Sequence, residues 1–278
     1  YLEQVTFLEV PGASSTNTIT LQSQSGTAAD VNLFYAASSA DNNWLMRFYG
    51  ADYFRLRNIT LTTNNNPSPS YGRGIVLFAG VENLLIESNT FIGSPITGVN
   101  TNFDLIYGTS LVSSHTTSFL TPRIIQDNTF NNGSNGIHLD GVNASTLASG
   151  TQILNNTFNN VRRGIELNYH LAPLVSGNVI TALSDRSIEL TYCDGALVVT
   201  KNKISVANTY AFYLYACDGG VPPSGTPGLI ANNFVTNFGN SGRGIYSYSN
   251  SYQNFYYNSS NVPGNTDSRA FEDYGGSN

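Results

Sequence analysis

Arg163-Gly164-Ile165-Glu166-Leu167-Asn168 is one copy of a pattern that recurs along the chain with altered chemistry. Each copy places an apolar residue, an outward residue and a second apolar residue in alternation. In the best-aligned copies the first apolar residue stands at Ile137, Ile165, Ile188 and Phe212, spaced 28, 23 and 24 residues apart. A recurrence at such a period is the signature of a repeat architecture. Further copies begin at Arg73 and Arg243.

A second sequence pattern recurs at the same spacing as the first. It consists of an apolar residue, an Asn three residues later and another apolar residue two further on, as in Ile153, Asn156 and Phe158. The same Asn recurs at Asn89, Asn128, Asn178, Asn202 and Asn233. Asn tolerates the backbone angles of a tight bend, and its amide can bond to the amide of the next repeat. Each repeat holds two or three short strands and has no room for a helix.

Such a unit cannot bury its apolar face alone, whereas stacked units bury a continuous core. The spacing therefore predicts an all-β fold, a single-stranded right-handed parallel β-helix (solenoid) with N-terminal capping strands. We expect one domain over residues 1–278, with capping strands over 1–44, stacked coils over 45–260 and a C-terminal tail over 261–278. Recurring residues should form columns with rungs about 4.8 Å apart.

The pairing of an Ile-x-x-Asn-x-Phe bend with a Gly-Ile-x-Leu strand resembles the repeats of the pectate-lyase-like β-helix superfamily. The opening is similar to secreted bacterial β-helix modules of large surface proteins, through Glu3-Gln4-Val5-Thr6, Pro11-Gly12-Ala13-Ser14 and Ala51-Asp52-Tyr53-Phe54. The resemblance covers nearly the whole chain. It implies the fold and, in members that act on polysaccharides, an active groove along the corresponding sheet. It does not choose an activity, because the superfamily holds lyases, hydrolases, epimerases, adhesins and stalks.

The composition of the chain limits the classes of partner that it can bind. The charged fraction is 11% and the formal net charge is −6, which argues against nucleic acid as a partner. No run of 18 apolar residues occurs, so we expect no membrane insertion. The chain begins at Tyr1 without a signal peptide, which suggests a mature piece of a longer precursor. We expect a secreted or cell-surface protein, either a monomer or part of a larger multidomain chain.

The two cysteines occupy equivalent positions of adjacent repeats. Cys193 lies five residues after Ile188, and Cys217 lies five after Phe212. The rung spacing falls within the Cα separation that a disulfide accepts, so a bridge and a stacked pair of thiols both fit. His170 occupies the same column one repeat earlier, but metal-binding cysteines usually form tighter local clusters. We expect no cofactor and no metal site; calcium is the alternative, without a clear Asp cluster to hold it.

The outward positions of the repeated strand carry the candidate catalytic residues. With Ile and Leu pointing inward, the residues between and after them point outward. The arginines before the strand should lie at the edge of the groove, because an unpaired Arg in an apolar core costs too much. The candidate catalytic residues are His138, Asp140, Arg163, Glu166, Arg186 and Glu189.

Toward the C-terminus the same columns become aromatic. Tyrosine offers a flat apolar face and a hydroxyl group for sugar rings, and Arg matches carboxylate or sulfate groups. We therefore expect an acidic or sulfated polysaccharide as the partner of this face. The candidate substrate-binding residues are Asn168, Tyr192, Tyr210, Tyr213, Tyr215, Arg243, Tyr246 and Tyr248.

Three readings of the charged centre stay open. Glu166 and Glu189 at close range suit a retaining glycosidase, and a wider pair such as Asp140 with Glu189 suits an inverting one. A lyase would instead use Arg163 or Arg186 to neutralise a uronate and His138 or a Tyr to remove a proton. The third reading is an Arg/Glu ladder that only ties strands together.

The sequence lacks the Asp set of calcium-dependent pectate lyases and the paired Asp-Asp with Gly-His-Gly of polygalacturonases. A polysaccharide lyase or hydrolase and a non-catalytic adhesin or stalk both remain, and a phage-type tailspike is a third class. Two excursions, about 103–121 and 218–227, leave from equivalent places and would wall a groove.

Overall fold

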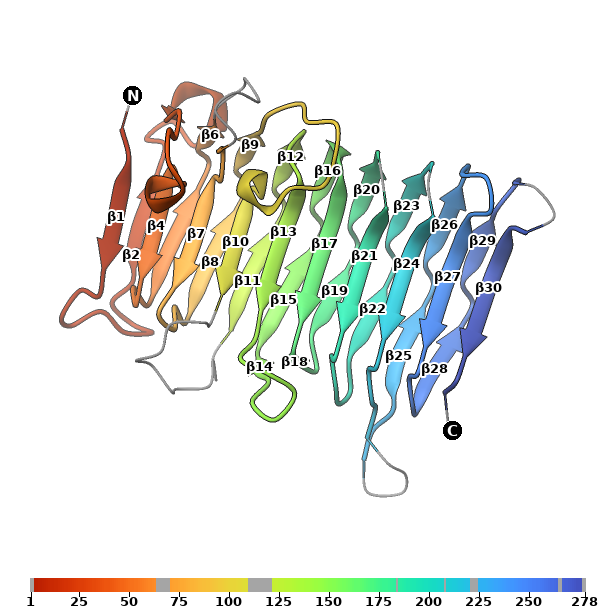
Figure 1. Cartoon of the computed structure of the whole chain (residues 1–278). Helices are drawn as coiled ribbons and strands as arrows, with labels where there is room; N and C mark the ends of the chain where they lie inside the picture. The colour runs from red at the N-terminus through yellow and green to blue at the C-terminus, as the bar shows by residue number, and fades with distance from the viewer. Residues whose placement is uncertain are drawn as a thin grey trace.

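The computed structural model describes residues 3–63, 71–109, 122–183, 185–207, 209–220, 225–264 and 267–276. The chain winds into a right-handed parallel β-helix, in which each coil adds one strand to each of three long parallel sheets (Figure 1). The described part contains only short 3-10 helices besides strands: η1 (Ala28–Asp30), η2 (Ala40–Asn42) and η3 (Thr101–Phe103). The predicted fold class is confirmed.

The first sheet holds the recurrent Ile-x-Leu strands. Its strands, in spatial order, are β1 (Val5–Leu8), β4 (Met46–Tyr49), β7 (Ile75–Phe78), β10 (Ile106–Thr109), β13 (Asn135–Asp140), β17 (Arg163–Asn168), β21 (Arg186–Thr191), β24 (Tyr210–Tyr215), β27 (Arg243–Tyr248) and β30 (Arg269–Tyr274).

The second sheet follows the first around each coil. Its strands are β2 (Ile19–Gln22), β5 (Phe54–Arg57), β8 (Leu84–Glu87), β11 (Arg123–Gln126), β15 (Thr151–Leu154), β19 (Leu174–Ser176), β22 (Val198–Thr200), β25 (Gly228–Ala231) and β28 (Gln253–Tyr256).

The third sheet closes the coil. Its strands are β3 (Asn32–Phe34), β6 (Thr60–Thr62), β9 (Thr90–Ile92), β12 (Thr129–Asn131), β16 (Thr157–Val161), β20 (Val179–Ala182), β23 (Lys203–Val206), β26 (Phe234–Asn237) and β29 (Ser259–Asn261). A small fourth sheet pairs β14 (Ala148–Ser149) with β18 (His170–Leu171).

The two ends of the chain take part in the coils. Strands β1, β2 and β3 pair in parallel with β4, β5 and β6, so the segment predicted as capping strands forms the first full coil. Strand β30 pairs with β27, which places part of the predicted tail over 261–278 in the first sheet. The stacking therefore extends beyond the predicted limits of 45 and 260.

The core is a set of stacked apolar columns. Ile137, Ile165 and Ile188 are fully buried and stand opposite one another in adjacent strands of the first sheet. In the third sheet Phe130 stacks on both Phe91 and Phe158, with ring centroids 4.7 Å apart. Gly164 is needed where the coil narrows, because a Cβ there would lie 2.6 Å from the carbonyl oxygen of Ser187 in the next coil. Buried columns of this kind fix the register, since a slip of one residue would expose the apolar set.

The recurrent Asn forms a continuous ladder between the second and third sheets, buried from Asn89 to Asn233 and half-buried at Asn258. Its members are Asn89, Asn128, Asn156, Asn178, Asn202, Asn233 and Asn258. At Asn156, Nδ2 donates to the Oδ1 of Asn178 at 3.1 Å and to the backbone oxygen of Ile125 at 2.8 Å. The predicted bond between amides is confirmed.

The expectation that the ladder Asn itself adopts unusual backbone angles is wrong. The positive φ belongs to the residue before it, for example Asp127 at 55° and Asn155 at 54°. The bend is made by that preceding residue, so the ladder Asn is free to satisfy the backbone groups of the neighbouring coils.

Replacing a ladder Asn should destabilise the whole chain. In Asn178→Ala the amide N–H of Asn156 and the carbonyl of Ile153 lose buried partners. At about 1–3 kcal/mol for each orphaned group, we expect a loss of about 3–5 kcal/mol, measured by chemical denaturation. Asn178→Asp should be at least as harmful, because it keeps the acceptor but loses both donors.

The control is Asn159→Ala, which removes a half-buried Asn of the outer face whose amide donates to Asn131 Oδ1 at 3.0 Å. We expect this change to cost about 1 kcal/mol or less. Equal losses for Asn159→Ala and Asn178→Ala would show that the ladder has no special role.

Candidate functional site

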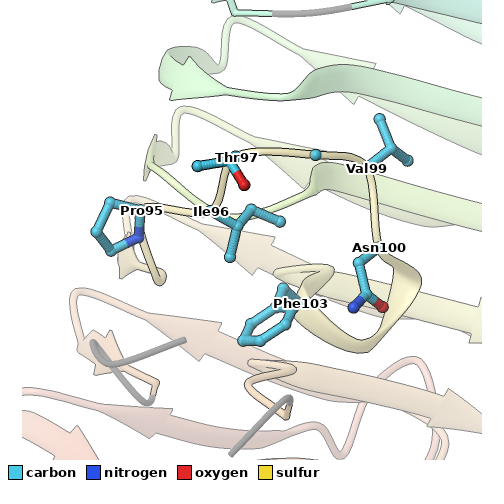
Figure 2. Close-up of a pocket in the computed structure, with 7 residues that line it drawn as sticks. Pro95, Ile96, Thr97, Val99, Asn100 and Phe103 are labelled. Carbon is cyan, nitrogen blue, oxygen red and sulfur yellow. The ribbon is translucent and has the colours of Figure 1, made fainter. Parts of the chain in front are cut away.

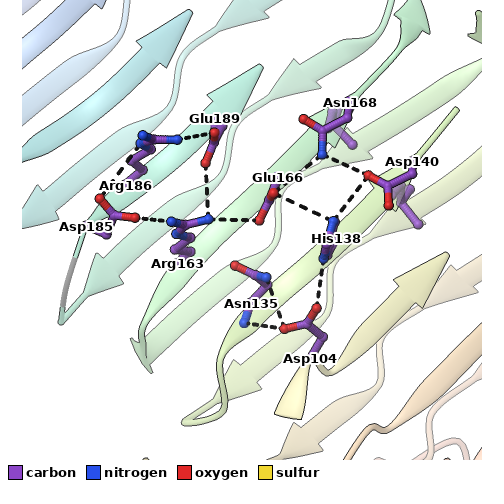
Figure 3. Close-up of polar contacts among 12 residues, drawn as sticks. Asp104, Asn135, His138, Asp140, Arg163, Glu166, Asn168, Asp185, Arg186 and Glu189 are labelled. Atoms are coloured by element: carbon purple, nitrogen blue, oxygen red, sulfur yellow. Dashed lines mark hydrogen bonds and ion pairs between the residues drawn. The ribbon is translucent and has the colours of Figure 1, made fainter. Parts of the chain in front are cut away.

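The middle of the first sheet carries the predicted charged residues on its outer face. His138 stands opposite Glu166, and Glu166 stands opposite Glu189, in the register of β13, β17 and β21. Asp140 stands opposite Asn168. The structure therefore brings all six candidate catalytic residues into one polar network (Figure 3).

His138 is the centre of one half of this network. Its Nδ1 lies 2.9 Å from Asp104 Oδ2, and its Nε2 lies 3.2 Å from Asp140 Oδ1 and 3.6 Å from Glu166 Oε1. Burial alone would lower the pKa of His138, but Asp104, Asp140 and Glu166 outweigh it and raise the pKa to about 10. His138 is therefore protonated at neutral pH, which does not support its predicted role as a general base.

Asp104 anchors the histidine from below. Its side chain is fully buried, and its Oδ1 accepts hydrogen bonds from the backbone N–H and the Nδ2 of Asn135, both at 3.0 Å. Burial raises the pKa of Asp104, while the bonds from His138 and Asn135 act against that rise. A buried acid of this kind is tolerated because it is paired and hydrogen-bonded.

Two arginines organise the other half. Arg163 Nη1 lies 3.2 Å from Glu166 Oε2 and 3.3 Å from Glu189 Oε2, so one guanidinium bridges the two glutamates. Arg163 also pairs with Asp185, and Arg186 pairs with Glu189 (Figure 3). Burial and the charge of Glu166 raise the pKa of Glu189, while Arg186 and Arg163 oppose the rise. The arginines lie at the outer surface of the first sheet, and they neutralise the carboxylates there.

Asp104, Tyr107 and Asp185 were missed by the sequence analysis. The predicted excursion over about 103–121 is wrong at its start, because Ile106–Thr109 forms strand β10, with Tyr107 as its outward residue. Asp104 then falls in the column that holds Arg73 and Arg163. The signal was Leu105-Ile106-Tyr107-Gly108, which continues the repeat after the longer loop.

The loop before β10 forms a pocket of about 340 Å³ from its own residues (Figure 2). Pro95, Ile96 and Phe103 line it, together with other uncharged residues. Arg162 fastens this loop to β17, because its Nε donates to the carbonyl of Ile96 at 2.6 Å. The lining offers no titratable side chain. Of the two predicted excursions, the parts over 110–121 and 221–224 lie outside the described residues.

The predicted tyrosine face exists, but its rings pack on one another. Tyr213 stacks on Tyr246 with centroids 5.4 Å apart, and Tyr215 stacks on Tyr248 at the same distance. Tyr210 lies 4.9 Å from Tyr246. Because the ring faces are used against each other, this surface presents mainly ring edges and hydroxyl groups. The expected stacking of sugars on the ring faces is therefore not supported here.

The remaining candidate binding residues have protein partners. Asn168 Nδ2 donates to Asp140 Oδ1 at 2.8 Å and so belongs to the charged network. Tyr192 stacks on Tyr169 at the corner after the strand, with centroids 5.2 Å apart. Arg243 pairs with Glu272 of the last strand.

The cysteine column is buried. Cys193 and Cys217 are free thiols in the structure; the backbone N–H of Cys193 donates to Cys217 Sγ at 3.3 Å. The thiols donate to the carbonyls of Leu167 and Leu190, both at 3.4 Å. Of the two arrangements that the sequence leaves open, a bridge and a stacked pair of thiols, the structure holds the stacked pair. Among the residues described, no three His, Cys, Asp or Glu side chains are grouped to hold a metal ion.

The two buried histidines should give the stability of the protein opposite dependences on pH. Because the folded pKa of His138 is raised to about 10, its stabilisation holds below pH 6.5 and is lost as the pH rises toward 10. Burial and then the charge of Arg123 lower the pKa of His170 to about 3, so its stabilisation holds above pH 6.5 and is lost toward pH 3.

The midpoint of unfolding should therefore fall as the pH is lowered from 6.5 toward 3 and as it is raised from 6.5 toward 10. We expect His138→Gln to flatten the alkaline limb alone and His170→Gln to flatten the acid limb alone. If both variants keep the wild-type slopes, these protonation states are wrongly assigned.

Comparison with known proteins gives one family. The sequence profile described as "Periplasmic copper-binding protein (NosD)" matches residues 120–271. No curated protein matches the chain, and no solved structure does. No helix among the described residues is long and apolar enough to cross a membrane.

The match bears on two expectations, the family resemblance and the absence of a cofactor. The β-helix repeat is confirmed, but the family found is not specifically the pectate-lyase-like one. The expectation of no cofactor is overturned, because the family's description names copper. The matched segment, residues 120–271, spans more than half of the 278 residues, and the chain therefore belongs to the NosD family.

Proposed function

We propose that this NosD-family chain is an exported β-helix module that binds an acidic or sulfated polysaccharide along the outer face of its first sheet. The observation that carries the proposal is the concentration of aromatic and ion-paired side chains on that one face. The family's description as periplasmic supports export. Display at a cell surface is the narrower form of the same proposal.

The outer face of the third sheet serves as an internal comparison. Outward positions of the third sheet are mostly small and polar, as in Thr90, Thr129 and Thr157, which stand opposite one another. The first sheet instead presents Glu166, Glu189, Tyr213 and Tyr246 in one column. Packing alone does not require this difference, since all three sheets bury their inner faces in the same way. A long, one-sided polar and aromatic surface suits an extended glycan.

The charged network supports binding more than cleavage. Arg163 is shared between Glu166 and Glu189, and His138 is held by carboxylates at both ring nitrogens. Groups that already satisfy one another give a rigid, preorganised surface. In this reading the tyrosine hydroxyls hydrogen-bond to sugar hydroxyls. The enzyme alternatives, a lyase or a hydrolase, are outcomes of the test, and so is a stalk that binds nothing.

The test is calorimetric titration with uronate-containing, sulfated and neutral polysaccharides, with product followed by absorbance near 235 nm and by reducing ends. We expect binding of the acidic polymers, weakened about tenfold in Tyr213→Ala/Tyr246→Ala, since the double variant removes two hydroxyl groups whose hydrogen bonds to the glycan contribute about 0.5–1.5 kcal/mol each. Phe234→Ala, an exposed aromatic on the third sheet, should bind as the wild type does.

If the wild type releases product and Glu166→Gln does not, the protein is an enzyme and the proposal of binding alone is wrong. If no polysaccharide of the panel binds, the proposal is wrong and a stalk that binds no glycan is the remaining reading.

Copper binding is the second candidate, favoured by the family match. The chain has two Cys and one Met as sulfur donors, the ligands that Cu(I) prefers. The fit is poor in this structure: both thiols are fully buried and hydrogen-bonded, and burial raises the pKa of Cys217. Both ring nitrogens of His170 are also engaged, with Thr151 Oγ1 at 3.0 Å and the carbonyl of Leu139 at 3.1 Å.

Equilibrium dialysis against Cu(I) and Cu(II) tests this candidate. Stoichiometric copper that disappears in Cys193→Ser/Cys217→Ser, but persists in His138→Gln, would assign it to the cysteine column. A wild-type protein that retains no copper would contradict the candidate.

A further inference from the structure

A cavity of about 320 Å³ opens on the first sheet beyond the charged network, toward the N-terminus. Its floor is the outer surface of β4, β7 and β10, and residues of η2 form one wall. The side chains that matter below are Trp44, Arg47, Arg73, Phe78 and Tyr107. The volume lies at the lower end of the range of small-molecule sites, about 300–1,000 Å³, so it suits one sugar-sized group.

Aromatic rings hold both arginines of this cavity in place. The guanidinium carbon of Arg47 lies 4.2 Å from the centroid of the Trp44 ring, and that of Arg73 lies 3.8 Å from the centroid of Tyr107. Nε of Arg73 donates to the carbonyl of Thr101 at 2.9 Å. Stacked guanidinium groups lose little further freedom when they bind an anion.

The two arginines differ from those of the charged network. Arg163, Arg186 and Arg243 each pair with a carboxylate. Arg47 and Arg73 form no ion pair within the described part of the chain. The positive charge of these two side chains is therefore not neutralised by a carboxylate of the described residues, and an anion bound in the cavity would neutralise it.

The charge around the cavity favours an anion. Asp41 is the acidic side chain in its lining, and it is exposed to solvent. Asp104 and Asp140 lie past Tyr107 and are bonded to His138. The cavity therefore has two half-buried guanidinium groups and one exposed carboxylate, so its charge is positive.

We propose that this cavity is the subsite for one uronate residue, an acidic sugar whose carboxylate is received by Arg47 and Arg73. Its ring lies against Trp44 and Phe78. The aromatic walls distinguish such a ligand from a bare inorganic anion, which would not use them. The proposal deepens the function proposed above and rests on it for the remainder of the glycan. The Tyr107 ring meets His138 edge-on, with centroids 5.2 Å apart, so a glycan seated here continues directly onto the charged network.

The test uses Trp44, which is the one tryptophan of the chain. Fluorescence excited at 295 nm is titrated with an unsulfated uronate disaccharide, its neutral counterpart, and sodium sulfate. We expect a saturable change with the uronate disaccharide alone, weakened at least tenfold in Arg47→Gln and in Arg73→Gln. Arg57→Gln is the matched control, because it also removes one guanidinium, and Arg57 lies in β5 of the second sheet, outside the proposed glycan face.

No saturable change, or an equal response to sulfate and to the disaccharide, would overturn the subsite. Equal affinity in the Arg47→Gln, Arg73→Gln and Arg57→Gln variants would also overturn it. Calorimetry with the polymer separates this failure from that of the wider proposal. If the polymer binds but the disaccharide gives no response, the subsite is wrong and the proposal of a glycan-binding face stands. If the disaccharide gives a response but the polymer does not bind, the glycan-binding face is wrong and the subsite stands.

Discussion

The stack of asparagine amides between the second and third sheets is the interaction on which the rest of the structure depends. Each coil must turn there, and the turn leaves backbone N–H and C=O groups without strand partners. An Asn side chain has both a donor and an acceptor, so it can satisfy the coil before and the coil after at once. Asn128, for example, donates to Asn156 and accepts from Asn89. A chain of such bonds in a dry interior fixes the rise from each coil to the next.

Once the rise and the register are fixed, the outer face follows. Residues at equivalent positions must lie side by side, whatever their charge. Glu166 and Glu189 are forced into adjacent rungs, where like charges repel, and Arg163 between them makes that arrangement tolerable. His138 is drawn into a cage of acids in the same way. The charged network is thus a consequence of the ladder as much as a set of separate contacts.

Most of the fold could be predicted from the sequence, because each coil of a β-helix corresponds to one repeat of the sequence. The columns through Ile165 and Glu166 were correct wherever adjacent repeats had similar lengths. The prediction was wrong at β10, where a longer loop hid the repeat, and Asp104 was missed with it. The partners of Arg163 and the mutual stacking of Tyr213 and Tyr246 depend on side-chain rotamers. A period of the backbone carries no information on these.

The aromatic side chains of the outer face are also distributed unevenly along the axis. Trp44 lies near the first coils, whereas the stacked tyrosines Tyr213, Tyr246 and Tyr248 lie in the last ones. In a solenoid each coil contacts only its neighbours, so the two ends can lose structure separately. Tryptophan emission therefore follows the first coils, whereas tyrosine near-ultraviolet dichroism is weighted toward the last coils, where Tyr213, Tyr246 and Tyr248 stack. Their transitions coincide if the chain unfolds as one unit, and they separate if it unzips from one end.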